Sequence, residues 1–204
     1  MTSIIGYSDT LLHVKISEEQ QKKALEHINS ECRRLERLSG KMMTLIGLYD
    51  EDRIHKEPYP VDRLVREVAD LERYHMQDSQ MELLAFSESW ECEMDVDLME
   101  SLLVNLLDNA IKASKPGSVI ELHGEKGCIW VRDFGKGIPE EEIPRITEAF
   151  YMVDKSRSRK AGGIGMGLAL CQKIAEIHRA NLVIESVVGQ GTKISVVFQE
   201  ETDE

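Results

Sequence analysis

The stretch GGIGMGLAL, residues 162–170, constrains this chain most, because it places four glycines in six residues directly before an apolar segment. Glycine adopts positive φ angles and lets the backbone approach a ligand closely. Where a glycine loop opens a helix, the first N–H groups of that helix are unpaired and lie at the positive end of its dipole. The sequence therefore predicts a helix start that can hold an anion.

Three common nucleotide-binding patterns do not fit this loop. A P-loop requires a lysine and a hydroxyl residue after its last glycine, but Leu168 and Ala169 follow Gly167. A dinucleotide fingerprint requires a third glycine where Leu168 lies. The sequence also lacks the V-A-I-K strand and the H-R-D loop of the Ser/Thr/Tyr kinases. The anion site therefore belongs to some other fold.

The composition argues against several classes of protein. A net charge of −12 over 204 residues disfavours nucleic acid or an anionic membrane surface as a partner, and we expect neither. No apolar run reaches the ~20 residues that span a bilayer, and the N-terminus shows no signal-peptide pattern. The four cysteines are scattered without a C-x-x-C pair, which argues against a zinc site and favours a reducing, cytoplasmic compartment.

Residues 1–55 predict a helical hairpin. Upstream of Ser17, a plausible helix cap, the segment TSIIGYSDTLLHV has its apolar residues at helical spacing. Downstream, a heptad stripe is formed by Leu25, Ile28, Cys32, Leu35, Ser39, Met42, Ile46 and Tyr49. Such a stripe favours pairing with a second copy, which predicts a homodimer through the hairpin. The alternative is an ordinary amphipathic hairpin that docks on its own domain.

Residues 56–200 predict a second domain of the α+β class. Two prolines in KEPYPVD break the helix and indicate a linker. The next segment, VDRLVREVADLERY, predicts a helix capped by Asp62, and DLMESLLVNLLDNAIKAS predicts a longer helix with Asp97 and Glu100 as a capping box. SVIELHG and CIWVRDFG alternate like strands, and two more strands are joined at GQG. This order favours a two-layer α/β sandwich with the helices on one face.

Three further segments carry chemistry that suits a phosphate ligand. Asn105, Asn109 and Lys112 share one helix face, where an amide oxygen can ligate Mg²⁺ and an ammonium can contact phosphate. Asp133 ends a strand beside a glycine turn and can accept a hydrogen bond from an exocyclic amine. DKSRSRK, residues 154–160, places four cations just before the glycine loop, where they suit a lid. Alone, each segment also fits a simpler explanation: a solvated helix face, a common Asp turn and a solvated basic loop.

Taken in order, these segments resemble the boxes of the histidine-kinase ATP-binding domain. That fold is shared with the GHKL group of topoisomerase, heat-shock chaperone and mismatch-repair ATPases. NLLDNAIKAS resembles the N box, DFGKGIP the first glycine box, EAFYMVDKSRSRK the phenylalanine box and lid, and GGIGMGLAL the second glycine box. GQGT resembles the last box, and residues 1–55 resemble the dimerisation hairpin of the family. The resemblance covers essentially the whole chain.

The resemblance implies ATP and Mg²⁺ as cofactors and assigns the phosphate end of the site. Asn109 would ligate Mg²⁺ with support from Asn105, and Lys112 would contact phosphate, so Asn105 and Lys112 would take part in catalysis. The phosphates would be wrapped at the helix start by Gly163, Gly165, Met166, Gly167 and Leu168.

The resemblance also assigns the adenine end and the lid. Asp133 would accept a hydrogen bond from the adenine amine, Gly135 and Gly137 would shape the pocket, and Thr192 would reach the same end. The lid would be anchored and charged by Phe150, Tyr151, Arg157 and Arg159.

The implied function is the kinase core of a two-component sensor histidine kinase. It would transfer the γ-phosphoryl of ATP to a histidine, for relay to an aspartate on the receiver domain of a response regulator. The acceptor motif of the family, His-Glu/Asp-x-x-Thr/Asn-Pro, would precede a segment like MTSIIGY, so we expect this chain not to phosphorylate itself at the usual site. Three departures from the family pattern, Ala113, Thr147 and Ile164, motivate the alternative of a non-catalytic dimerising module. Asn105 stands where hydrolytic GHKL members have a glutamate base, which disfavours a free-standing ATPase.

Overall fold

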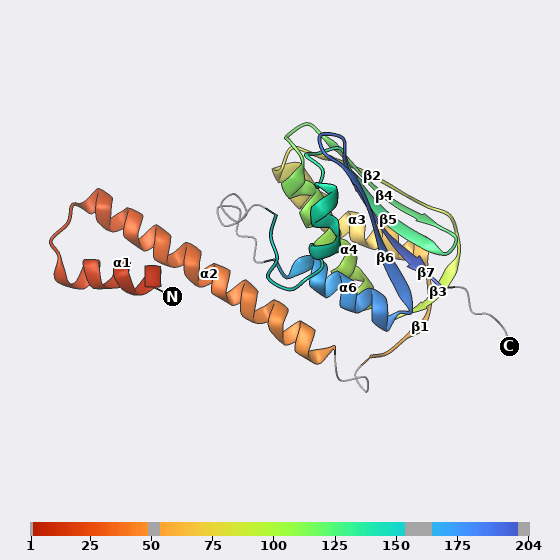
Figure 1. The fold of residues 1–204 in the computed structure, drawn as a ribbon, viewed down its shortest axis with the longest axis horizontal. Coiled ribbons are helices and arrows are strands. Elements are labelled where there is room, and N and C mark those ends of the chain that lie inside the picture. Colours follow the sequence, from red (N-terminus) through yellow and green to blue (C-terminus); the bar gives the residue numbers. More distant parts are fainter. Residues whose placement is uncertain (1, 49–53, 154–164, 200–204) are drawn as a thin grey trace. The chain divides into compact units, whose positions relative to one another are not determined.

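The computed structural model describes residues 2–48, 54–153 and 165–199 of the chain (Figure 1). By its internal contacts the chain divides into two compact units, Met1–Thr44 and Leu45–Glu204, and each is described by itself. The predicted domain bounds of 1–55 and 56–200 stay a prediction. No helix among the described residues is both long and apolar enough to cross a membrane.

The first unit is a hairpin of two helices, α1 (Thr2–His13) and most of α2 (Glu18–Gly47). Ser17 caps α2 as predicted: its hydroxyl accepts a hydrogen bond from the Gln20 N–H at 3.3 Å, and the Gln20 side chain accepts one from the Ser17 N–H at 3.1 Å. Tyr7 of α1 stacks on His27 of α2 with ring centroids 4.9 Å apart. The hairpin predicted from the sequence is therefore present.

The second unit is an α+β sandwich of two layers, which confirms the predicted fold class. Helices α3, α4 and α6 cover one face of a five-stranded sheet of order β2-β4-β5-β7-β6, in which only β2 and β4 are parallel (Figure 1). A separate pair of strands, β1 and β3, is antiparallel. The elements of this unit are β1 (Glu57–Pro60), α3 (Val61–Asp78), β2 (Glu82–Ser87), β3 (Glu91–Met94), α4 (Val96–Ala113), β4 (Val119–Glu125), β5 (Cys128–Asp133), the 3₁₀-helix η2 (Glu140–Arg145), α6 (Gly167–Ile177), β6 (Ala180–Val187) and β7 (Gly191–Phe198).

Two local expectations about helix starts are wrong. Helix α4 is capped by Asp95, whose Oδ1 accepts a hydrogen bond from the Leu98 N–H at 3.1 Å, rather than by a box of Asp97 and Glu100. Helix α3 begins after Pro60, and Asp62 lies inside it, where it forms an ion pair with Arg66 at 2.8 Å. Aspartates are common both at the cap and in the first turn, so spacing alone does not separate these positions.

The segment expected to be a linker is strand β1. Its two prolines lack an N–H, but β1 has a single partner, β3, and proline is tolerated in such edge strands. The pairing aligns Pro58 with Glu93 and Pro60 with Glu91. The prolines therefore do not end the long helix, since α2 ends at Gly47, and they do not make a linker of the segment that contains them.

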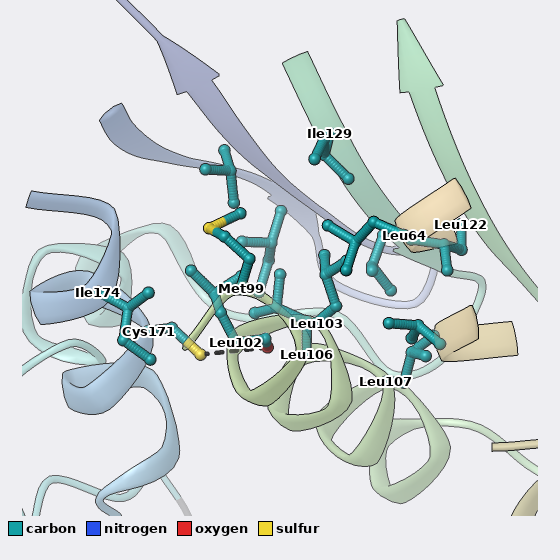
Figure 2. Packing of buried hydrophobic residues seen from close by; sticks show 14 of the residues in the cluster. Leu64, Met99, Leu102, Leu103, Leu106, Leu107, Leu122, Ile129, Cys171 and Ile174 are labelled. Carbon is teal, nitrogen blue, oxygen red and sulfur yellow. Dashed lines mark hydrogen bonds between the residues drawn. The ribbon is translucent and has the colours of Figure 1, made fainter. Parts of the chain in front are cut away.

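The core lies between the sheet and the helices (Figure 2). Helix α4 supplies most of it because its apolar residues recur at intervals of three and four. These residues, all less than 2% exposed, are Met99, Leu102, Leu103, Leu106 and Leu107. Leu64 of α3, Leu122 of β4 and Ile129 of β5 pack against them. The core holds α4 firmly, and α4 carries the predicted phosphate-binding residues at its other side and end.

Candidate nucleotide site

Asp133 lies at the end of β5, a strand inside the sheet, paired with Ile120 of β4 and Thr192 of β7. Only 5% of its surface is exposed, and its Oδ1 accepts a hydrogen bond from the Gly135 N–H at 2.8 Å. Burial raises the pKa of the Asp133 carboxyl, while backbone hydrogen bonds from Gly135 and Thr192 oppose the rise. The site therefore presents a buried acceptor that can take a hydrogen bond from a ligand amine.

The loop after Asp133 is wedged between the end of α4 and the β6–β7 turn. A Cβ added at Gly135 would lie 2.4 Å from the Ala113 carbonyl oxygen, and one added at Gly137 would lie 2.1 Å from that of Val187. The Lys136 N–H donates to the Ala113 carbonyl at 3.2 Å. Glycine is thus required here because the backbone of another segment approaches closely. The loop joins the end of α4 to Asp133, the residue predicted to contact adenine.

Thr192 lies beside Asp133 and is 6% exposed. Its hydroxyl shares a 2.9 Å hydrogen bond with the hydroxyl of Ser186, which also accepts one from the Ile138 N–H at 2.8 Å. Ser186 was missed by the sequence reasoning, and only the β6–β7 register, which pairs it with Thr192, reveals it. This hydroxyl pair fixes both β7 and the loop around the candidate pocket.

On α4, the three predicted residues differ in what they contact. The Asn105 Nδ2 donates to the Ser101 carbonyl at 2.7 Å. The Asn109 Nδ2 is buried and has no hydrogen-bond partner among the described residues. Lys112 forms an ion pair with Asp108 at 2.5 Å, a partner that the i, i+4 spacing could have indicated. The unpartnered amide of Asn109 is the group on this helix that most needs a ligand, since an unsatisfied buried polar group costs about 1–3 kcal/mol.

The base of the predicted lid is held by local contacts. Phe150 has φ +68°, and its N–H donates to the Gly165 carbonyl at 2.8 Å. Gly165 has φ +73°, and a Cβ there would lie 2.6 Å from the Tyr151 carbonyl oxygen. The Tyr151 hydroxyl binds Glu142, and the Arg145 guanidinium lies 4.2 Å from the centre of its ring. Phe150 and Tyr151 thus contact Gly165 just before the start of α6.

Helix α6 begins at Gly167 after Met166, which gives no side-chain cap, and no side-chain acceptor for its first N–H groups is found among the described residues. Met166 before it is 2% exposed, and Leu168 packs against the core. A helix start of this kind suits an anion. Three predicted ligands, Gly163, Arg157 and Arg159, lie outside the described residues.

The structure thus brings Asp133, Gly135, Gly137 and Thr192 together where β5 ends and β7 begins, next to the end of α4. It joins Phe150, Tyr151 and Gly165 at the start of α6, a helix that packs on α4 through the 3.6 Å contact of the Cys171 Sγ with the Leu102 carbonyl oxygen. The roles assigned to these residues stay predictions.

Comparison with known proteins places this chain in a family. The model for "Histidine kinase-, DNA gyrase B-, and HSP90-like ATPase" matches residues 94–202. Sensor histidine kinase YkoH of Bacillus subtilis is 33% identical over 181 residues, which are 87% of this chain and 39% of YkoH. Sensor protein SrrB of Staphylococcus aureus is 27% identical over 194 residues, 92% of this chain and 33% of SrrB. The chain therefore spans well under half the length of either relative.

Solved structures agree on the fold. Histidine kinase ThkA, in complex with response regulator protein TrrA, matches with a TM-score of 0.74 at 22% identity, over 96% of this chain and 56% of that one. Acinetobacter baumannii histidine kinase AdeS matches with a TM-score of 0.68 at 18% identity, over 98% of this chain and 95% of that one. With the family model covering residues 94–202, the chain belongs to the histidine kinase-, DNA gyrase B-, and HSP90-like ATPase family and carries the GHKL-type catalytic domain of a sensor histidine kinase.

Proposed function

We propose that this chain binds Mg-ATP and transfers its γ-phosphoryl group to a histidine, from which an aspartate on a response regulator receives it. The observation that carries the proposal is the pair of buried, ligand-ready polar groups at one side of the fold. Asp133 is 5% exposed and offers an acceptor for the adenine amine, and the buried Nδ2 of Asn109 has no hydrogen-bond partner among the described residues, so it is free to donate to a phosphate oxygen. Family membership and the response regulator complex of ThkA support the choice of ligand and partner.

The site residues would each bind a different part of Mg-ATP. Asp133 would fix the adenine end, and the uncapped start of α6 and Lys112 would face the phosphates. Asn109 would hold Mg²⁺ through its amide oxygen, and the metal would supply neutralisation of the phosphate charge. The histidine nitrogen would attack the γ-phosphorus as the bond to the β,γ-bridging oxygen breaks and ADP leaves. Asn105 cannot take a proton from water, which favours transfer over hydrolysis.

A second candidate is a non-catalytic signalling module of the same fold. The observation that favours it is the 2.5 Å ion pair of Lys112 with Asp108, because a phosphate must compete with a carboxylate for this ammonium. The two candidates differ in a direct assay. Labelled γ-phosphoryl that appears on a polypeptide carrying the acceptor histidine supports the kinase, and nucleotide binding without transfer supports the module. Steady phosphate release without any acceptor would instead indicate an ATPase.

We further propose that the hairpin pairs with a second copy and that the domain works in the reducing cytoplasm. Several residues of the predicted stripe are exposed in the hairpin, with Leu25 at 52%, Met42 at 42% and Ile46 at 61%. An exposed apolar stripe of this length favours a helical dimer interface. Sedimentation of the chain at micromolar concentration tests the dimer, which Leu25→Glu and Ile46→Glu should weaken.

The ligand assignment is tested by calorimetric titration with Mg-ATP. In Asp133→Asn the amide oxygen can keep the Gly135 N–H, so the amide nitrogen, a donor, would face the adenine amine, also a donor. The loss of a charged hydrogen bond, worth about 1.5–3 kcal/mol, predicts a Kd roughly 10- to 150-fold higher. Asp97→Asn is the matched control, since Asp97 is exposed in the first turn of α4. Equal affinity in wild type and Asp133→Asn would overturn the adenine assignment.

A further inference from the structure

The chain enters the catalytic unit through two residues that bind the ends of two different helices. The His55 N–H donates to the Asp95 Oδ2 at 3.0 Å, and Asp95 is the cap at the start of α4. The Lys56 ammonium donates to the Ile177 carbonyl at 2.5 Å, at the end of α6. These residues precede β1, so the segment that follows the hairpin in sequence is tied to both helices at one point.

His178 joins the same two helix ends from inside. It is 5% exposed, its Nε2 accepts a hydrogen bond from the Asp95 N–H at 2.9 Å, and its Nδ1 lies 2.7 Å from the Ile174 carbonyl oxygen. Because Nε2 faces a donor and Nδ1 faces an acceptor, these partners select the neutral ring with its proton on Nδ1. A protonated ring would place a second N–H against that of Asp95.

The N–H and both carboxylate oxygens of Asp95 are hydrogen-bonded. Its N–H donates to His178, its Oδ1 accepts from the Leu98 N–H, and its Oδ2 accepts from the His55 N–H. A residue held by two side-chain hydrogen bonds and one backbone hydrogen bond has one geometry, so the start of α4, the end of α6 and the entering segment are fixed relative to one another. We refer to Lys56, Asp95 and His178 as the junction.

Both helices lead from the junction to the candidate nucleotide site. At 1.5 Å per residue, the fourteen-residue step from Asp95 to Asn109 covers roughly 21 Å along α4. Helix α6 runs in the opposite sense, from Gly167 beside the glycine loop to its end at the junction. The two helices touch midway, where the Cys171 sulfur meets the Leu102 carbonyl (Figure 2). A shift at the junction would therefore be transmitted by these two helices to the end of α4 and to the start of α6.

We propose that His178 is a positioning residue and that Lys56 is the handle through which the segment after the hairpin sets the register of α4 against α6, and with it the nucleotide site. The functional part of this proposal rests on the proposed function. When the ammonium of Lys56 leaves the Ile177 carbonyl, α6 loses a cation bound at its C-terminal end, where the helix dipole favours positive charge. The end of α4 and the start of α6, which lie away from the junction, then become more mobile.

Hydrogen exchange of the full chain without nucleotide tests the junction independently of ATP. In Lys56→Met we expect roughly two- to tenfold faster exchange at residues 109–113 and at Leu170, whose N–H donates to the Met166 carbonyl at the start of α6; this is the range expected for loss of one hydrogen bond. Lys56→Arg should restore wild-type exchange because its guanidinium still donates to a carbonyl. Lys126→Met, an exposed lysine in the β4–β5 turn, is the matched control and should leave exchange unchanged.

The outcome at the distant residues decides the proposal. Faster exchange confined to residues 55–57, 95–98 and 174–178 would show that the junction acts only locally and would overturn it. His178→Gln provides a second variant: it keeps an acceptor for the Asp95 N–H and should exchange more slowly at residues 109–113 than His178→Leu. A wild-type chain that fails to bind Mg-ATP would overturn the proposed function and leave this exchange result standing.

Discussion

Replacing Gly137 by alanine tests how the loop beside Asp133 is held, because two separate penalties act at this position. Gly137 has φ +67°, and an added Cβ would lie 2.1 Å from the Val187 carbonyl oxygen. A left-handed backbone costs an alanine about 1–2 kcal/mol, and overfilling a packed site adds about 1–3 kcal/mol. Gly137→Ala should therefore lower the free energy of unfolding by about 2–5 kcal/mol.

Two other glycines separate the penalties. Gly127 has φ +79° with open space where a Cβ would lie, so Gly127→Ala should cost only the backbone term of about 1–2 kcal/mol. Gly135 does not have positive φ, but its added Cβ would lie 2.4 Å from the Ala113 carbonyl oxygen. Gly135→Ala should therefore cost only the packing term of about 1–3 kcal/mol.

Urea unfolding followed by tryptophan fluorescence measures these costs in the catalytic unit alone, since both tryptophans, Trp90 and Trp130, lie there. The order expected is Gly137→Ala as the least stable variant, with the other two closer to wild type. If Gly137→Ala costs no more than Gly127→Ala, the close approach of this loop to Val187 is refuted. The loop would then not be held against the β6–β7 turn as we describe.

Three further outcomes follow from single residues. Burial raises the folded pKa of Asp133 above its ordinary value of 3.8, so ionisation of Asp133 destabilises the fold as the pH rises through that folded pKa. Asp133→Asn should therefore raise the Tm at pH 7 without nucleotide and lose this advantage below about pH 4. Burial lowers the folded pKa of His178 below 6.5, against the hydrogen bond to the Ile174 carbonyl and the charge of Asp95, and Lys56 lowers it further. The stabilisation by His178 should be complete above about pH 6.5 and be lost as the pH falls through the folded pKa, a loss that urea titrations of His178→Gln should not show. Arg179 follows α6 with φ +51°, so Arg179→Gly should stabilise the chain by about 0.5–1 kcal/mol in the same urea assay.

Local patterns in the sequence predicted the parts of the fold that local chemistry determines. The apolar spacing of α4 and the Ser17 cap of α2 needed no tertiary information, and both are present. The cap of α4 was assigned wrongly because three carboxylates lie within six residues, and only contacts with His55 and His178 select Asp95. Strand β1 was missed because its pairing with β3 joins segments more than thirty residues apart.

The candidate site follows the same division. Asp133, Gly135 and Gly137 could be picked out because a strand that ends in a carboxylate and a glycine turn is a local pattern. Ser186 could not, since its hydrogen bond to Thr192 depends on the register of β6 with β7. His178 carries no motif, and its role depends on the ends of two helices that meet only in the folded chain.

The site residues weaken the empty fold in ways that a nucleotide would repair. Burial disfavours the ionised form of Asp133, and the Asn109 Nδ2 is buried without a hydrogen-bond partner among the described residues. An adenine amine would give the first group a donor, and a phosphate oxygen would accept a hydrogen bond from the second. Ligand binding should therefore stabilise the catalytic unit by the mass-action term and also reverse the ranking of variants. Asp133→Asn should melt above wild type without nucleotide and below it in saturating Mg-ATP, and a nucleotide-independent ranking would contradict the assignment of these groups to one ligand.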